Sequence, residues 1–433
     1  MMNTVFSMPT KRAAQQLMGA VMLILPSAAA WAQVTVLQNA TVHPISAPAI
    51  EQAQVVMADG KIVDVGVDLD VPADATVIDL TGHHLYPGFV HPATQLGLTE
   101  ISSVAGTVDT REMGQINAAL NVEVAVNHDS ELLPASIAGG ILTAHIIPGG
   151  GLIQGHSAVM NLDGWSWEEM LIASQAGQHI AFPPGAVDDE DNEDLSRINS
   201  VLDQARHWHQ ADAAASAGNG ERPPRNDQLQ ALGPLLAGET PLMLHANRYD
   251  VMEAALDWAD TQGFDNVVLV ATPDVQHIAS RLADADIPVI LKNVYALPMR
   301  RHDGYDASFK APRVLAEAGV KFAIADATRG MDVANARNLP FQAGSAVAHG
   351  LDPDIAMKAV TLWPAEILGV GDQLGSLEPG KRATLFAANG HPLEPMTQIT
   401  HVWIDGARYA LSDVKARRLY DRYRQRHPGD ESP

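Results

Sequence analysis

The chain has 433 residues, 46% of them hydrophobic, a formal net charge of −23 at pH 7 and no cysteine. So large a negative charge repels phosphate backbones, and we expect no nucleic-acid partner. The absence of cysteine excludes disulfides, thiolate metal ligands and thiol nucleophiles, so any metal must be held by His, Asp, Glu or a modified Lys.

The first 32 residues have the pattern of an export signal. Lys11 and Arg12 precede an apolar run from Leu17 to Leu25, and Ala30-Trp31-Ala32 has the small-x-small pattern of a cleavage site. This pattern predicts cleavage after Ala32 and a periplasmic or secreted mature protein, with an uncleaved N-terminal anchor as the alternative. The apolar run is too short to cross a bilayer of about 30 Å, so we expect no permanent membrane anchor.

Two β-rich segments lie at opposite ends of the remaining chain. Residues 33–86 and 377–412 are rich in β-branched residues, and each contains an Asp-Gly pair typical of tight hairpins, Asp59-Gly60 and Asp405-Gly406. We predict that both segments form one small composite β-sandwich domain. Residues 413–433 are predicted to be a C-terminal helix and tail.

Residues 87–376 alternate short apolar runs with helical patterns. The runs "PLMLHAN", "NVVLVAT", "PVILKNV" and "KFAIAD" are typical of buried strands. They recur at the spacing of roughly 20 to 35 residues that a (β/α)8 TIM barrel requires. The acid-rich and Ala-rich segment 188–226 breaks this rhythm, and we interpret it as a surface excursion.

Five strings occur in an order that resembles the amidohydrolase superfamily, especially its imidazolonepropionase-like branch. They are "VVMADGKIVDVG", "VIDLTGHHLYPGFV", "ARNLPFQAG", "VTLWPAEILGV" and "GSLEPGKRATLF", and the likeness runs from about Val34 to Leu411. The resemblance implies a distorted (β/α)8 barrel with a β-sandwich built from both termini, in agreement with the alternation above. It also implies hydrolysis of C–N bonds in cyclic amides, amidines or dipeptide-like substrates, with one or two divalent metals activating water.

The ligand positions that the resemblance implies are only partly filled. Ala93 and Gln95 replace the two histidines of the first strand. No lysine stands between Lys61 and Lys292, so a carboxylated lysine on the fourth strand is excluded, and the sixth strand has no histidine. His245 at the end of the fifth strand and Asp326 at the end of the eighth remain. We therefore expect the usual two-metal centre to be absent.

A displaced site with a single metal ion is one interpretation of the remaining residues. His91, His245 and Asp326 would be three N/O ligands for one divalent ion, most plausibly zinc, with Asp326 accepting a proton from bound water. The alternative is that His91 is a buried histidine hydrogen-bonded to backbone. His145 and His156 flank a glycine turn, "PGGG", that is better explained as a tight strand end than as a nucleotide loop.

Further polar residues are candidates for binding a small-molecule substrate. Arg300 and Tyr305 have the chemistry to bind a substrate carboxylate, although pairing of surface arginines with Asp303 and Asp306 is an equal alternative. The full set of substrate-binding candidates is Gln95, His156, Arg248, Arg300 and Tyr305.

Two functional hypotheses follow. The first is an exported hydrolase of C–N bonds that uses at most one divalent metal. The second is a catalytically inactive relative that keeps the barrel as a ligand-binding or scaffolding protein. The sequence leaves the substrate and the oligomeric state open, a homo-oligomer included.

Overall fold

The computed structural model describes residues 34–189, 191–326 and 330–424. The predicted signal and its cleavage point after Ala32 lie outside the described residues. Within these ranges, no helix has the length and apolar character needed to cross a membrane.

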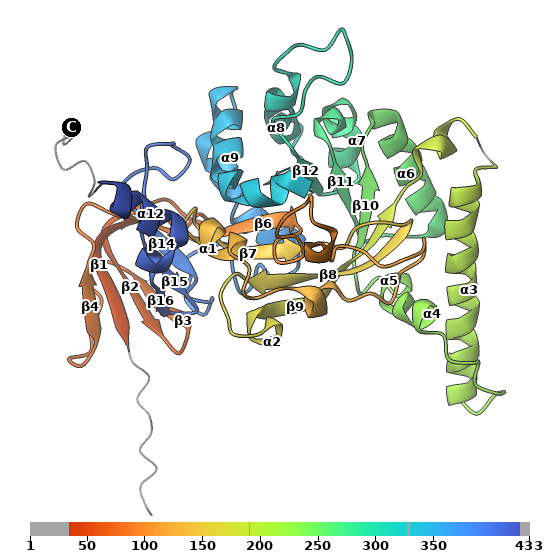
Figure 1. The fold of residues 1–433 in the computed structure, drawn as a ribbon, viewed down its shortest axis with the longest axis horizontal. Helices are drawn as coiled ribbons and strands as arrows, with labels where there is room; N and C mark the ends of the chain where they lie inside the picture. Colours follow the sequence, from red (N-terminus) through yellow and green to blue (C-terminus); the bar gives the residue numbers. More distant parts are fainter. Residues whose placement is uncertain (1–33, 190, 327–329, 425–433) are drawn as a thin grey trace, which may run out of the picture. The chain divides into compact units, whose positions relative to one another are not determined.

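One of two eight-stranded sheets forms the barrel (Figure 1). Seven neighbouring pairs are hydrogen-bonded in chain order, and the pairs are parallel except on the two sides of the third strand, β8, which runs antiparallel to both neighbours. The predicted distorted (β/α)8 barrel is therefore confirmed, with one reversed strand that the sequence analysis did not anticipate. The strands are β6 (Phe89–Thr94), β7 (Ile141–Ile146), β8 (Ile153–Asn161), β9 (Leu171–Ala181), β10 (Leu242–Ala246), β11 (Val267–Ala271), β12 (Val289–Lys292) and β13 (Phe322–Ala325).

A loop fills the gap between the first and last strands of the barrel. The Val90 amide donates to the Val360 carbonyl at 2.9 Å, and the Ile324 amide donates to the Ala359 carbonyl at 3.0 Å. These bonds satisfy backbone groups of β6 and β13 that would otherwise lie at an open sheet edge. Ala359 and Val360 thus close the barrel.

Helices pack against the outside of the barrel because each carries an apolar stripe. In α6, the buried residues recur at helical spacing, from Val251 and Met252 to Ala259, and the helix ends at Gly263 with a left-handed φ of 78°. The helices of the barrel region, α6 included, are α1 (Leu132–Ile137), α2 (Trp167–Met170), α6 (Tyr249–Gln262), α7 (Ala279–Asp284), α8 (Ala307–Glu317), α9 (Leu339–Ala348), α10 (Pro353–Lys358) and α11 (Leu362–Ile367).

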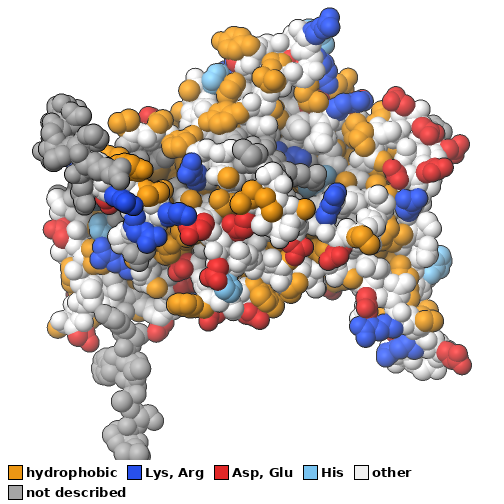
Figure 2. Space-filling model, viewed as in Figure 1, with side chains coloured by type: hydrophobic (Ala, Val, Ile, Leu, Met, Phe, Trp, Pro, Cys, Tyr) orange, Lys and Arg blue, Asp and Glu red, His pale blue; other side chains and the backbone are white. Residues whose placement is uncertain are grey.

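The segment predicted as an excursion is dominated by one long helix, α3 (Glu193–Ser216). Asn192 caps its start by accepting from the Leu195 amide, and Glu193 and Asp194 occupy its first turn, where negative charge is favourable. Acidic side chains gather over this end of α3 in Figure 2. Two short helices, α4 (Asp227–Ala231) and α5 (Gly233–Leu236), return the chain to the barrel.

The second sheet joins both ends of the described chain, as predicted. Its order is β16-β15-β14-β5-β1-β2-β3, and β4 also pairs with β1. The strands are β1 (Thr35–Val42), β2 (Ile50–Ala58), β3 (Lys61–Gly66), β4 (Thr76–Asp79), β5 (His84–Pro87), β14 (Leu385–Ala388), β15 (Ile399–Ile404) and β16 (Ala407–Tyr409). Residues from both chain ends share one apolar core, which includes Leu37, Leu85, Leu385 and Trp403.

The two Asp-Gly pairs form the predicted hairpin turns. All four residues have positive φ, between 49° and 76°, as a two-residue type I′ turn requires. The two turns also meet, because a Cβ placed on Gly60 would lie 3.2 Å from the Asp405 carbonyl oxygen. The Asp405 carboxylate accepts from Asn161 of barrel strand β8 at 2.7 Å and from Arg382, so this turn links the second sheet to the barrel.

The predicted domain limit at residue 86 lies one residue before the end of β5. The predicted limit at residue 376 lies shortly before the start of β14. The predicted C-terminal helix is α12 (Lys415–Arg424), which has no buried residue among those described. Arg417 ties it to the sheet by donating to the Ile399 carbonyl at 2.7 Å.

Candidate functional site

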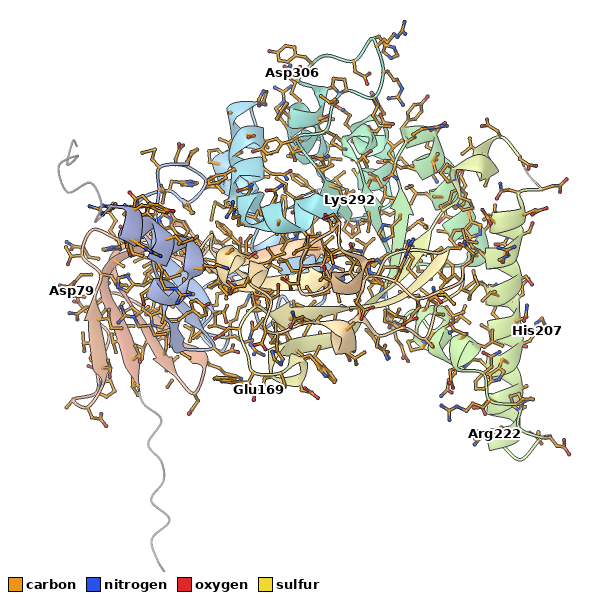
Figure 3. All side chains as sticks on the ribbon, viewed as in Figure 1. Asp79, Glu169, His207, Arg222, Lys292 and Asp306 are labelled. Atoms are coloured by element: carbon orange, nitrogen blue, oxygen red, sulfur yellow. The ribbon has the colours of Figure 1, made fainter. Side chains whose placement is uncertain are left out.

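A cavity of about 680 Å³ opens at the carboxyl ends of barrel strands β9, β10 and β12. We call it the mouth cavity. In barrels of this kind, the loops that follow the strands meet at this end and carry the functional residues. Lys292, at the end of β12, is labelled in Figure 3. The lining residues are Gly150, Gly151, Gln154, Ala181, Phe182, Pro184, His245, Ala246, Asn247, Arg248, Val251, Thr272, Lys292 and Asn293.

His245 lines the mouth cavity and pairs with a second histidine. It stands on the fifth barrel strand, as predicted, and is 8% exposed. Its Nε2 lies 2.8 Å from Nδ1 of His179, which belongs to the fourth strand and is fully buried. A hydrogen bond between two imidazole nitrogens needs one proton, so one ring donates and the other accepts. The two imidazoles therefore form a proton-sharing pair beside the cavity.

Sequence reasoning missed His179. The segment "IASQAGQHIA" carries few large apolar residues and follows directly on the short helix α2, so it was not recognised as a strand. The last residues of this strand, from Ala176 to Ile180, are all buried and do not alternate between polar and apolar, so no local pattern marks His179. His179 occupies the fourth strand, the one on which a ligating lysine was excluded.

Deeper in the barrel, His145 is held in one tautomer. Its Nδ1 lies 2.6 Å from the Pro92 carbonyl oxygen, and because a carbonyl can only accept, this nitrogen carries the proton. Its Nε2 lies 2.7 Å from the Ser157 hydroxyl, which also lies within 3.2 Å of the Gly177 carbonyl oxygen. Complete burial lowers the pKa of His145 to about 4, the Pro92 carbonyl opposes that effect, and the nearby His91 adds to it. His145 is therefore neutral at pH 7.

Burial of neutral His145 predicts a loss of stability in mild acid. The pKa is 6.5 in the unfolded chain and about 4 in the folded one, so between these pH values only the unfolded chain binds the proton. The contribution is complete above pH 6.5 and is lost as the pH falls towards 4, by on the order of 3 kcal/mol. Urea unfolding at pH 7.5 and pH 4.5 measures the change.

The control for this prediction is His145→Gln, which removes the titrating group. Because carboxylates also titrate in this range, the informative quantity is the difference in pH dependence between wild type and variant. A His145→Gln variant with the same loss of stability between the two pH values would show that His145 does not contribute.

His91 and Asp326 form a second close pair. Both are buried, at 0% and 3% exposure, and His91 Nε2 lies 3.5 Å from Asp326 Oδ2. His91 Nδ1 accepts weakly from the Ala93 amide at 3.4 Å, while Nε2 has no hydrogen-bond partner among the described residues. The sequence left open a second interpretation, in which His91 is a buried histidine hydrogen-bonded to backbone. The structure differs from it at Nε2, because this nitrogen faces the Asp326 carboxylate.

The three predicted metal ligands do not form one group. His91 and Asp326 are adjacent, but Nε2 of His245 is engaged with His179. In the described part of the chain, no set of three His, Cys, Asp or Glu residues is close enough to hold an ion. As arranged, these residues do not fit a preformed metal site, and the single-ion site remains a prediction. Ala93 is part of an apolar cluster inside the barrel.

The predicted substrate-binding residues are dispersed. Arg248 lines the mouth cavity and forms a two-point ion pair with Asp250. Gln95 is buried against the glycine turn, because a Cβ on Gly149 would lie 2.8 Å from its amide nitrogen. His156 is buried with its Nε2 3.2 Å from the Ala231 carbonyl at α4. Because strand side chains alternate, His156 faces the opposite side of β8 from its neighbour Ser157, the residue that contacts His145.

Arg300 and Tyr305 lie on the long loop after β12. Arg300 binds the buried Asp274 carboxylate at 2.6 and 3.0 Å and stacks over the Tyr249 ring at 4.8 Å. Hydrogen bonds from Arg300 and Tyr249 outweigh burial and lower the pKa of Asp274. Tyr305 is 85% exposed. The structure thus gives Arg300 an internal partner and does not bring either residue into the lining of the mouth cavity.

Comparison with known proteins finds similarity to proteins described as amidohydrolases. Residues 242–408 match the model of the Amidohydrolase family. Over 391 residues, the chain is 22% identical to the amidohydrolase tasK of Hapsidospora irregularis; the match covers 78% of this chain but 37% of that protein. A 46-residue stretch is 50% identical to a dihydroorotase of Mycobacterium tuberculosis, 11% of that enzyme. The chain therefore spans well under half the length of these curated relatives.

Solved structures match over nearly their whole length. An amidohydrolase from Thermotoga maritima MSB8 is 25% identical, with a TM-score of 0.78 over 87% of this chain and 99% of that one. A prolidase solved with N-methylphosphonate-L-proline is 17% identical, with a TM-score of 0.54 over 87% of this chain and 99% of that one, and shares the fold.

Proposed function

Because this chain belongs to the amidohydrolase superfamily, we propose that it is a hydrolase of carbon–nitrogen bonds other than peptide bonds. We place the reaction in the mouth cavity. Cyclic amides, cyclic amidines and dipeptide-like molecules are the proposed substrates. The assignment to the imidazolonepropionase-like branch remains a prediction.

One observation carries this proposal: a histidine pair borders a cavity of substrate size at the functional end of the barrel. The volume of about 680 Å³ falls within the range of small-molecule sites. His245 lines this cavity, and His179 supports it from the neighbouring strand at 2.8 Å. A reacting group can therefore meet an imidazole whose orientation is already fixed.

Hydrolysis needs a group that accepts a proton from the attacking water. We assign this role at the cavity to His245, because a neutral imidazole has one unprotonated nitrogen that can accept a proton. His179 is a positioning residue, since it reaches the substrate only through His245. Asp326, which lies 3.5 Å from His91, is the second proposed proton acceptor, a role that rests on the sequence.

Members of this family generally use divalent metals such as zinc. Since the described residues do not fit a preformed ion site, we derive no step that uses an ion. Metal analysis of protein purified without chelators tests the prediction of at most one divalent ion per chain. Two metal equivalents would contradict it.

Export to the periplasm or the medium, with cleavage after Ala32, is part of the proposal and rests on the sequence pattern alone. Small-molecule substrates, rather than nucleic acid or a membrane anchor, are the proposed partners, and N-terminal sequencing of the mature protein tests the cleavage. The possibility of a homo-oligomer stays open.

The experiment that tests the proposed activity is a substrate panel. Purified protein is incubated with cyclic amides, cyclic amidines and dipeptide-like amides, and release of amine or ring-opened product is measured by mass spectrometry. We expect turnover of at least one class. A folded protein that binds panel members without converting any would favour the alternative, an inactive relative that serves as a binding protein.

A further inference from the structure

The charge of the mouth cavity is opposite to that of the whole chain. The chain has 51 acidic and 28 basic residues. Yet the charged side chains among the lining residues are Arg248 and Lys292, and none of the described lining residues is Asp or Glu. A cavity with cationic groups and apolar walls raises the local concentration of anions.

Lys292 is fixed at the cavity by the strand that carries it. It is the last residue of β12, and its Nζ donates to the Asn247 side-chain oxygen at 3.2 Å. Asn247 follows β10, so two strand ends hold the ammonium group at the barrel mouth. Lysine is an effective partner for carboxylates because its ammonium group has three donors on a flexible chain.

Arg248 keeps donors available despite its ion pair. Its Nε and Nη2 atoms face the Asp250 carboxylate, so Nη1 is not part of that pair. Asp250 and the nearby Asp188 favour the charged form of Arg248, whereas Arg300 opposes it. The guanidinium group therefore stays charged beside the cavity, with its Nη1 donors remaining for a ligand.

Two backbone donors line the same cavity. Gly150 and Gly151 have φ values of 79° and 75°, and their N–H groups have no acceptor among the described residues. Side chains are excluded here, because a Cβ on Gly151 would lie 2.9 Å from the Gln115 carbonyl oxygen. The glycine turn thus places two backbone N–H groups without an acceptor among the described residues in the wall of the cavity, and groups of this kind can bind anions.

We propose that the substrate carries a carboxylate, which binds in the mouth cavity to Lys292 and Arg248 with support from the glycine turn. This inference rests on the function proposed above and names its substrate class. The subsite orients the substrate, so that its C–N bond faces His245.

Isothermal titration with an isosteric pair of probes tests this subsite. Glutarate and glutaramide have the same carbon skeleton, and only glutarate carries carboxylates. We expect glutarate to bind at least tenfold more tightly than glutaramide at low salt, and 0.5 M NaCl to weaken its binding. Equal affinity for the two probes would overturn the proposal. Tighter binding of inorganic phosphate than of glutarate would overturn the choice of a carboxylate.

Variants locate the binding. Lys292→Gln should weaken glutarate binding about tenfold and Arg248→Gln severalfold, whereas Lys292→Arg should retain it and so separates loss of charge from misfolding. Arg225→Gln is the matched control, because Arg225 also pairs with an aspartate two residues later, Asp227, but lies on an exposed loop away from the cavity. Unchanged binding in both cavity variants would refute the site.

The titration needs no turnover, so the two proposals fail separately. Protein that binds glutarate through Lys292 but hydrolyses nothing would retain the anion subsite and overturn the proposed activity. Protein that hydrolyses neutral amides as fast as their carboxylate analogues, and does not bind glutarate, would retain the activity and overturn the subsite.

Discussion

Replacing His245 by Ala should lower kcat for the hydrolysis of a C–N bond by a factor of about 10² to 10⁴, the usual contribution of a general base. His245 lines the mouth cavity and is held by His179 at 2.8 Å, so its loss removes the proton acceptor nearest to a bound substrate. KM should change little, because the imidazole acts on the attacking water more than on the bound substrate. Steady-state kinetics on a substrate identified by the panel measures both constants.

The matched control is His207→Ala. His207 is an exposed histidine on α3, away from the barrel mouth (Figure 3), and its replacement should leave kcat unchanged. Circular dichroism and urea unfolding must show that His245→Ala keeps the fold, since loss of the hydrogen bond to His179 should cost about 1 to 3 kcal/mol. A folded His245→Ala variant with wild-type kcat would contradict the assignment.

The role of His179 is tested on the same substrate. If His179 acts only through His245, His179→Ala should lower kcat less than His245→Ala does, and the double variant should be no worse than His245→Ala alone. Additive losses in the double variant would instead give His179 an independent role in the reaction.

The sequence predicted the scaffold well because several independent patterns agree. Continuous apolar runs in β10 to β13 are what strands buried on both faces require, and their C-terminal ends point to one end of a barrel. For that reason His245 could be placed at the mouth from sequence alone. The Asp-Gly turns at Gly60 and Gly406 were predictable because only residues that tolerate positive φ fit a type I′ turn.

The reversed strand β8 and the histidine on β9 were harder to predict. Whether a strand runs parallel or antiparallel depends on which neighbours it meets, and the stretch from Ile153 to Ala181 is a β8–β9 hairpin joined through a single turn of helix. Nothing in the local pattern distinguishes this hairpin from two strands of a β/α unit. His179 was missed with it, because a side chain can be assigned to the barrel interior only once its strand is known.

Partners that depend on tertiary contacts were also beyond the sequence. From the sequence, Asp303 and Asp306 are candidate partners for the arginines after the seventh strand. In the structure Asp303 does lie 4.0 Å from the Arg300 guanidinium, but the shorter contacts of Arg300, 2.6 and 3.0 Å, are to Asp274, 26 residues earlier. Asp274 follows β11 and Arg300 follows β12, so they meet only because these strands are neighbours in the barrel. The same holds for Lys292 and Asn247 at the mouth cavity.

Asp326→Asn should lower kcat by a factor of about 10² to 10⁴ while preserving the fold. The substitution keeps the shape of the side chain and removes its negative charge, which lies 3.5 Å from His91 Nε2 inside the barrel. An amide cannot accept a proton from water or stabilise a protonated imidazole, so both functions of the pair are lost. The measurement is kcat across pH 5 to 9, together with the urea midpoint.

Two further variants separate chemistry from structure at this pair. Asp265→Asn makes the same change at an exposed aspartate and should alter neither kcat nor stability. Asp326→Glu keeps the charge and should retain more activity than Asp326→Asn. The prediction is wrong if Asp326→Asn is folded and fully active. If Asp326→Asn loses kcat while Asp326→Glu retains it, the negative charge itself takes part in the reaction, because a purely structural role would favour the isosteric amide over the longer carboxylate.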